Sequence, residues 1–158
     1  MAGQVVILMG SKGDLEHVNK IVERLKALGV AYVLRIASAH KSVHHLLAII
    51  ESYNKSTGPV VFIAVAGRSN ALAGMVDANT AYPVITCPPP STVFAGADIY
   101  SSLRMPSGVV PLVILEPDGA ALAAAKLLAL TDTELRARIR AFQASMTQDI
   151  IEADKSLA

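Results

Sequence analysis

Short apolar runs that alternate with helix-like patterns are the feature that most constrains how this chain can fold. Runs rich in Val, Ile and Leu predict strands at residues 4–9, 30–36, 60–66, 83–86 and 109–115. Apolar residues at helical spacing predict helices at residues 15–28, from Ser42 onward, and at 69–79 and 119–130. Strands that alternate with helices need crossover connections, which favour a parallel sheet with helices on both faces. The nearly charge-free first run is typical of a strand buried on both faces. The pattern therefore predicts an α/β fold.

A last helix is predicted over about residues 131–156, and no strand follows it. Its apolar stripe consists of Leu135, Ile139, Phe142, Met146 and Ile150. The preceding Thr131-Asp132-Thr133-Glu134 has the pattern of a capping box. Because this helix has no strand of its own to cover, we expect it to pack on a neighbouring subunit. The 158 residues are otherwise expected to form a single domain.

Composition excludes several classes of protein. Hydrophobic residues make up 53% of the chain and charged residues only 17%, which excludes intrinsic disorder. The formal net charge of +1 gives no excess of basic residues of the kind that nucleic-acid-binding proteins carry. Cys87 is the single cysteine, so an internal disulfide and a cysteine-built zinc site are excluded.

The chain is hydrophobic enough to raise the question of a membrane. Its longest charge-free stretch, residues 78–97, contains Pro83, Pro88, Pro89 and Pro90, which would break a spanning helix. The N-terminal residues lack the pattern of a secretory signal. We therefore expect a soluble cytoplasmic protein, and the excess of small aliphatic residues over charged ones favours an oligomer.

Candidate ligand-binding residues follow the first predicted strand. In an open parallel sheet, ligands bind beyond the carboxyl ends of the strands, so the loops after the first three strands should meet at one edge. Gly10 and Gly13 permit tight turns, and the following helix N-terminus offers N–H groups to an anion such as phosphate. Ser11 adds a hydroxyl donor, although Ser11 and Asp14 are also typical helix caps. The loop is neither a Walker loop nor a G-x-G-x-x-G fingerprint, which argues against ATP and dinucleotides.

The loop after the second predicted strand carries a candidate for acid–base chemistry. His40 can gain or lose a proton near neutral pH, and Lys41 can hold a phosphate as a point charge. The alternative interpretation is a packed or surface histidine without a catalytic role. His44 and His45 are adjacent and do not share a helical face, so no metal site is expected there.

Two further stretches supply small residues, hydroxyls and guanidinium groups. One is Gly67-Arg68-Ser69-Asn70 after the third predicted strand, and the other covers residues 101–108. Either could be an ordinary polar loop. Cys87 precedes three prolines, and a packed free thiol is favoured over a nucleophile there.

Taken together, these motifs resemble the PurE family of purine biosynthesis, over nearly the whole chain. The resemblance rests on four segments in order: Met9-Gly10-Ser11-Lys12-Gly13-Asp14, Ser38-Ala39-His40-Lys41, Ala66-Gly67-Arg68-Ser69-Asn70, and Ser101-Ser102-Leu103-Arg104-Met105-Pro106-Ser107-Gly108. The family has a mutase branch, which rearranges N5-carboxyaminoimidazole ribonucleotide, and a carboxylase branch, which adds CO₂ to 5-aminoimidazole ribonucleotide (AIR).

Two departures from the mutase pattern resemble the carboxylase branch, class II of the family. Mutases typically carry Ser-Ala-His-Arg, whereas Lys41 stands in the place of that arginine. They also carry a second histidine in a Gly-Gly-Ala-Ala-His-Leu loop, which Gly67-Arg68-Ser69-Asn70-Ala71-Leu72 lacks. Gly13 departs from both branches, since the first loop usually has a second serine there.

The resemblance implies a flavodoxin-like, three-layer αβα subunit in a homo-octamer. It implies reversible carboxylation of AIR to 4-carboxy-5-aminoimidazole ribonucleotide (CAIR) with CO₂, without ATP, biotin, metal or other cofactor. His40 would be the general acid/base. The expected substrate contacts are Ser11, Asp14, Ser38 and Lys41 for the ribose phosphate, and Gly67 and Ser69 for the carboxylate or CO₂.

Three alternatives to this activity stay open at the level of sequence. The first is the mutase reaction, which differs in the substrate that delivers the carboxyl group. The second is a nucleotide-binding module without catalysis. The third is an FMN-binding electron carrier, against which the aromatic content of 4% argues, since few rings could stack on the flavin.

Overall fold

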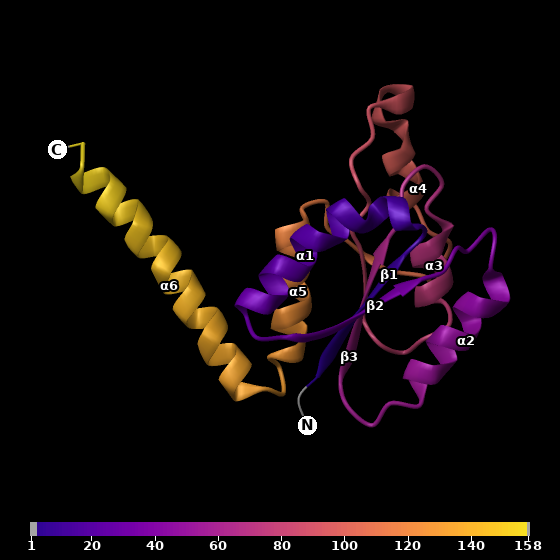
Figure 1. The fold of residues 1–158 in the computed structure, drawn as a ribbon, viewed down its shortest axis with the longest axis horizontal. Coiled ribbons are helices and arrows are strands. Elements are labelled where there is room, and N and C mark those ends of the chain that lie inside the picture. Colours follow the sequence, from indigo (N-terminus) through magenta and orange to yellow (C-terminus); the bar gives the residue numbers. More distant parts are fainter. Residues whose placement is uncertain (1–2, 158) are drawn as a thin grey trace.

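A five-stranded, all-parallel sheet forms the middle layer of the protein (Figure 1). The computed structural model describes residues 3–157. The strands lie in the order β2-β1-β3-β4-β5, which is the flavodoxin-like order. Their bounds are β1 (Gln4–Met9), β2 (Ala31–Ile36), β3 (Val60–Val65), β4 (Val84–Thr86) and β5 (Leu112–Val113). The predicted α/β fold and parallel sheet are confirmed.

Helices cover both faces of the sheet and complete a three-layer αβα sandwich. The covering helices are α1 (Leu15–Ala27), α2 (Val43–Asn54), α3 (Ala71–Asp77) and α5 (Pro117–Leu128). Successive side chains of a strand point to opposite faces, so Val5 and Ile7 join the core under α1 and α5. Val6 and Leu8 join the core under α2 and α3. Both faces of β1 are thus buried, which explains its uninterrupted apolar run.

The fifth strand is much shorter than the predicted span of residues 109–115. Gly108 has a φ of 84°, which turns the chain just before the strand, and Pro111 has no N–H to donate to a ladder. The N–H of Val110 donates instead to a carboxylate oxygen of Asp77 at 2.7 Å. The neighbouring helix, predicted from residue 119, begins earlier at Pro117, because proline suits the first turn of a helix.

A helical excursion between β4 and β5 was not predicted. It consists of the 3₁₀ segment η2 (Val93–Ile99) and the short helix α4 (Tyr100–Leu103), and it stands out from the sandwich in Figure 1. Phe94, Ala95 and Gly96 have positive φ values of 51°, 54° and 75°. Phe94 and Tyr100 are exposed.

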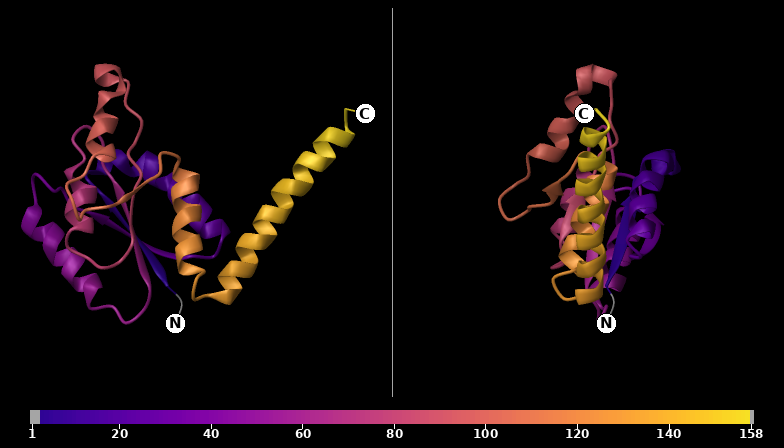
Figure 2. Two further views of the ribbon diagram at one scale, coloured as in Figure 1. Left: turned by 180° about the vertical axis from the view of Figure 1, so that it is seen from behind. Right: turned by 90° about the vertical axis from the view of Figure 1, so that its left-hand side faces the viewer.

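The predicted terminal helix is present as α6 (Thr133–Lys155). The expected capping box at Thr131 is wrong: Asp132 is the N-cap, and its carboxylate accepts the N–H of Leu135 at 2.9 Å. Only Leu135 and Ile139 are buried in this helix. From residue 143 onward every described side chain is exposed, and Figures 1 and 2 show α6 projecting away from the sandwich. Within residues 3–157, no helix combines the length and the hydropathy needed for a membrane span.

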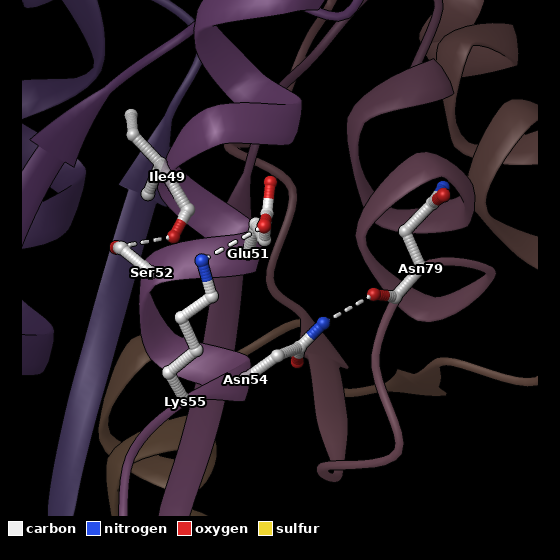
Figure 3. Close-up of polar contacts among 6 residues, drawn as sticks. All are labelled: Ile49, Glu51, Ser52, Asn54, Lys55 and Asn79. Carbon is white, nitrogen blue, oxygen red and sulfur yellow. Dashed lines mark hydrogen bonds and ion pairs between the residues drawn. The ribbon is translucent and has the colours of Figure 1, made fainter.

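At the amino ends of the strands, Asn54 ties the end of α2 to the segment after α3 (Figure 3). Its amide donates to the carbonyl oxygen of Asn79 at 2.8 Å and its side-chain oxygen accepts the hydroxyl of Thr80 at 2.6 Å. The same turn of α2 carries an exposed ion pair between Lys55 and Glu51 at 2.9 Å (Figure 3).

Candidate active site

The loops that follow β1, β2 and β3 line one pocket of about 670 Å³. The structure brings all the predicted site residues to its lining: Ser11, Asp14, Ser38, His40, Lys41, Gly67 and Ser69. Arg68 and Leu72 also line it, together with the small residues Gly10, Gly13, Ala39 and Ala66.

The register of the sheet explains why these loops meet. β1 lies between β2 and β3, and its last residue, Met9, is opposite Ile36 on one side and Val65 on the other. The three strands therefore end at the same level. The N–H of Gly10 donates to Val65 at 3.0 Å and that of Ala37 donates to Met9 at 3.0 Å. These two bonds extend the ladder by one residue, so the loops begin side by side.

Ser11 and Asp14 form a capping box around η1 (Lys12–Asp14) in the first loop. The backbone N–H of Ser11 donates to Asp14 Oδ2 at 2.9 Å, and the hydroxyl of Ser11 lies 3.1 Å from the same oxygen. The N–H of Gly13 donates to Ser11 Oγ at 3.2 Å. The capping interpretation is thus confirmed, and both polar side chains are held at the rim of the pocket.

A tight turn in the second loop presents His40 and Lys41 to the pocket. Ser38 Oγ accepts the N–H groups of His40 at 3.3 Å and Lys41 at 3.2 Å. The N–H of Ser38 donates to Ser42 Oγ at 2.9 Å, which fixes the turn to the start of α2. The His40 side chain is exposed, and its ring has no hydrogen-bond partner among residues 3–157. A bound ligand could therefore use both ring nitrogens.

The third loop supplies backbone and positive charge. A Cβ on Gly67 would lie 3.4 Å from Pro89 Cγ, so this part of the loop packs closely against the proline segment. Arg68 has a φ of 57°, in the left-handed region that few non-glycine residues adopt. Lys41 and Arg68 outnumber Asp14 among the charged residues of the lining, which suits an anionic ligand.

A second cavity of about 400 Å³ shares Gly67 with this pocket and includes Pro88, Pro89 and Pro90 in its lining. Sequence reasoning missed His17, which is buried at this cavity with its Nε2 3.4 Å from Cys87 Sγ. Burial lowers the pKa of His17 below its ordinary value and raises the pKa of Cys87 to about 12. The expectation of a packed free thiol at Cys87 is confirmed.

His44 and His45 are exposed on α2 and do not line the pocket. Among residues 3–157, no three His, Cys, Asp or Glu side chains are grouped so that they could hold a metal ion.

Comparison with known proteins places the chain in a family. The family model for AIR carboxylase matches residues 4–149. The chain belongs to the AIR carboxylase family. It is 48% identical over 153 residues to the phosphoribosylaminoimidazole carboxylase of Treponema denticola, covering 97% of this chain and 96% of that protein. It is 52% identical over 154 residues to the same-named protein of Archaeoglobus fulgidus, covering 98% of this chain and 84% of that protein.

The fold agrees with this membership. The crystal structure of Treponema denticola PurE matches with a TM-score of 0.96 and 48% identity, and the match covers 98% of both chains. The PurE resemblance and the flavodoxin-like fold predicted from the sequence are therefore confirmed. The chain is an enzyme of the carboxy-lyase type from purine biosynthesis.

Proposed function

We propose that this AIR carboxylase family member adds CO₂ directly to C4 of AIR and reverses that reaction, with His40 as the general acid/base and without ATP, biotin or metal. One observation carries the proposal: the exposed imidazole of His40, which has no hydrogen-bond partner among residues 3–157, lines the same pocket as a loop suited to an anion and a loop rich in small residues. Its relatives from Treponema denticola and Archaeoglobus fulgidus, both named carboxylases, support the choice of reaction.

The reaction needs only a proton acceptor and a pocket that confines CO₂ beside C4 of AIR. The aminoimidazole is an enamine, so C4 attacks the carbon of CO₂, a C–C bond forms and one C=O π bond becomes a carboxylate. C4 is then tetrahedral and still carries its hydrogen. His40 takes that proton, the C–H electrons restore the aromatic ring, and the reverse reaction returns the proton to C4.

The loops divide the substrate between them. Lys41 and Ser38 offer hydrogen-bond donors to the ribose phosphate, and the hydroxyl of Ser11, which donates to Asp14 Oδ2 in this structure, would turn to the phosphate when it binds. The carboxylate of Asp14 suits the ribose hydroxyls, because it accepts hydrogen bonds. Gly67 and Ser69 leave room for CO₂ beside C4. Since CO₂ binds weakly, holding it in place is the main contribution of this loop.

Two substrates offered separately test the proposal. Purified protein is given either AIR with dissolved CO₂ or N5-carboxyaminoimidazole ribonucleotide, in buffer without ATP and with EDTA, and CAIR is measured by chromatography. The proposal expects CAIR from the first mixture. Turnover of the N-carboxylated substrate alone would assign the mutase reaction and reject direct carboxylation.

We also propose that the chain works in the cytoplasm as a homo-octamer in which α6 packs on a neighbouring subunit. In the outer half of α6, from residue 143 to Lys155, the exposed fractions of Met146 and Ile150 are 43% and 73%. A helical segment as short as this half is only marginally stable in water when nothing packs against it. Apolar side chains are also exposed along the sheet edge formed by β5.

Native mass spectrometry of the wild type and of Ile150→Glu tests this assembly. The proposal expects eight copies for the wild type and a smaller species for the variant. Ala141→Glu is the control, because Ala141 is exposed on the opposite side of the same helix. A monomeric wild-type protein, or equal effects of the two variants, would contradict the proposal.

A further inference from the structure

Asn70, Thr86 and Ser102 form a buried polar cluster directly behind the loop of residues 67–69. Their exposed fractions are 2%, 0% and 1%. The side-chain amide of Asn70 donates to Thr86 Oγ1 at 2.7 Å and to Ser102 Oγ at 2.9 Å. Its oxygen accepts the N–H of Ala73 at 3.3 Å and caps α3. Both amide hydrogens and the oxygen are used, so the orientation of this amide is fixed.

The backbone of the loop is held by a second set of contacts. The N–H of Asn70 donates to Ser101 Oγ at 2.9 Å. The same hydroxyl lies 2.7 Å from the carbonyl oxygen of Asp98 and 3.3 Å from that of Arg68. Arg68 has a left-handed φ of 57°, a conformation that persists in non-glycine residues only where the surroundings enforce it. These contacts anchor the loop at the carbonyl of Arg68 and at the N–H of Asn70, two residues further on.

Asn70 does not line the pocket, whereas Gly67, Arg68 and Ser69 do. The loops proposed to hold the ribose phosphate follow β1 and β2, and within residues 3–157 Asn70 forms no hydrogen bond to either of them. Any effect of the cluster on a ligand therefore passes through the loop of residues 67–69.

We propose that Asn70 is a positioning residue whose buried amide sets the shape of the 67–69 loop and, through it, the place of CO₂ beside C4 of AIR. The proposal rests on the proposed function, since it concerns the CO₂ side of that reaction. A cluster with a purely structural role would lower stability without changing one substrate more than the other.

Asn70→Ala and the matched control Asn54→Ala separate these two roles. Asn54 also ties two elements together through its amide (Figure 3). It lies at the amino ends of the strands, whereas the pocket lies at their carboxyl ends. At saturating AIR, we expect kcat/KM for CO₂ to fall about 100-fold in Asn70→Ala, as for a misplaced reactant. The KM for AIR stays near the wild-type value, and Asn54→Ala changes neither constant.

Ser102→Ala provides a milder version of the change if Asn70→Ala does not fold. It removes one of the two acceptors of the Asn70 amide, and we expect a smaller decrease in kcat/KM for CO₂. The proposal would be overturned if the kinetic constants for AIR and for CO₂ changed equally. It would also be overturned if kcat/KM for CO₂ fell no more in Asn70→Ala than in Asn54→Ala.

Hydrogen exchange of the peptide containing residues 67–70 separates failure of this proposal from failure of the proposed function. If the wild type does not carboxylate AIR, the proposed function fails, and exchange still reports whether Asn70 holds the loop. We expect faster exchange in Asn70→Ala than in Asn54→Ala. Unchanged exchange in Asn70→Ala would overturn the positioning role whatever the activity.

Discussion

Replacing His40 by asparagine should separate catalysis from stability more cleanly than any other change in this site. The side chain is exposed, and its ring makes no hydrogen bond within residues 3–157. Substitutions at such positions usually change the free energy of unfolding by less than about 0.5 kcal/mol. An asparagine amide keeps some polarity but cannot take a proton from carbon near neutral pH.

The expected loss of activity is far larger than the loss of stability. General acid–base catalysis contributes about 10²–10⁴-fold to a rate. At 1.36 kcal/mol for each factor of ten, the barrier rises by about 3–5 kcal/mol. His40→Asn should therefore keep the wild-type thermal unfolding temperature and subunit assembly while its turnover falls by several orders of magnitude.

Initial rates of CAIR decarboxylation at saturating substrate measure the turnover, and calorimetry measures the unfolding temperature. His44→Asn is the matched control, because His44 is also exposed but lies on α2 outside the pocket lining. A decrease of less than about tenfold in His40→Asn would refute the base role. An equal decrease in His44→Asn would show that the loss does not arise from proton transfer at His40.

The other predictions concern the phosphate, the buried thiol and the buried imidazole. Lys41→Ala should raise the KM for AIR about 10- to 100-fold, since a hydrogen bond to a charged group contributes about 1.5–3 kcal/mol; an unchanged KM would place the phosphate elsewhere. Burial raises the pKa of Cys87 from 9.0 to about 12, so DTNB should label the native protein at least about 10³-fold more slowly than the unfolded chain, and comparable rates would contradict this. Burial lowers the pKa of His17 below 6.5, so the unfolded chain binds its proton more tightly. The stability that His17 provides is complete above pH 6.5 and is lost as the pH falls below it. Urea titrations between about pH 8 and 5 should show a flatter dependence in His17→Gln, and parallel curves would refute it.

The central part of the fold was predictable because its strands are buried on both faces. β1 and β3 agree with the predicted runs to within one residue, since all their residues except Gln4 at the start of β1 are apolar and buried. The edge strand β5 was not predictable from hydropathy. Its predicted run is apolar, but Pro111 and the turn at Gly108 leave only two residues in the ladder.

The pocket was predictable from one rule about parallel sheets, because strand ends at a common level bring their loops together. The cluster behind it was not predictable. Thr86 and Ser102 lie 16 and 32 residues from Asn70, and no local pattern links them. His17 was missed although it lies four and eight residues before Ile21 and Leu25, on the buried face of α1. A polar residue does not count toward an apolar stripe, so only this spacing could have indicated its burial.

If the proposed assembly is correct, the helical order of the projecting half of α6 depends on contacts with neighbouring subunits. The described residues from 143 onward are exposed, so this part of the helix should lose its order when dilution separates the subunits, whereas the sandwich keeps its own two cores. Circular dichroism at decreasing protein concentration should therefore register a partial loss of ellipticity before any catalytic loop is disturbed. Substitutions in this part of α6 would then weaken contacts between subunits more than they would lower the stability of the sandwich that carries them.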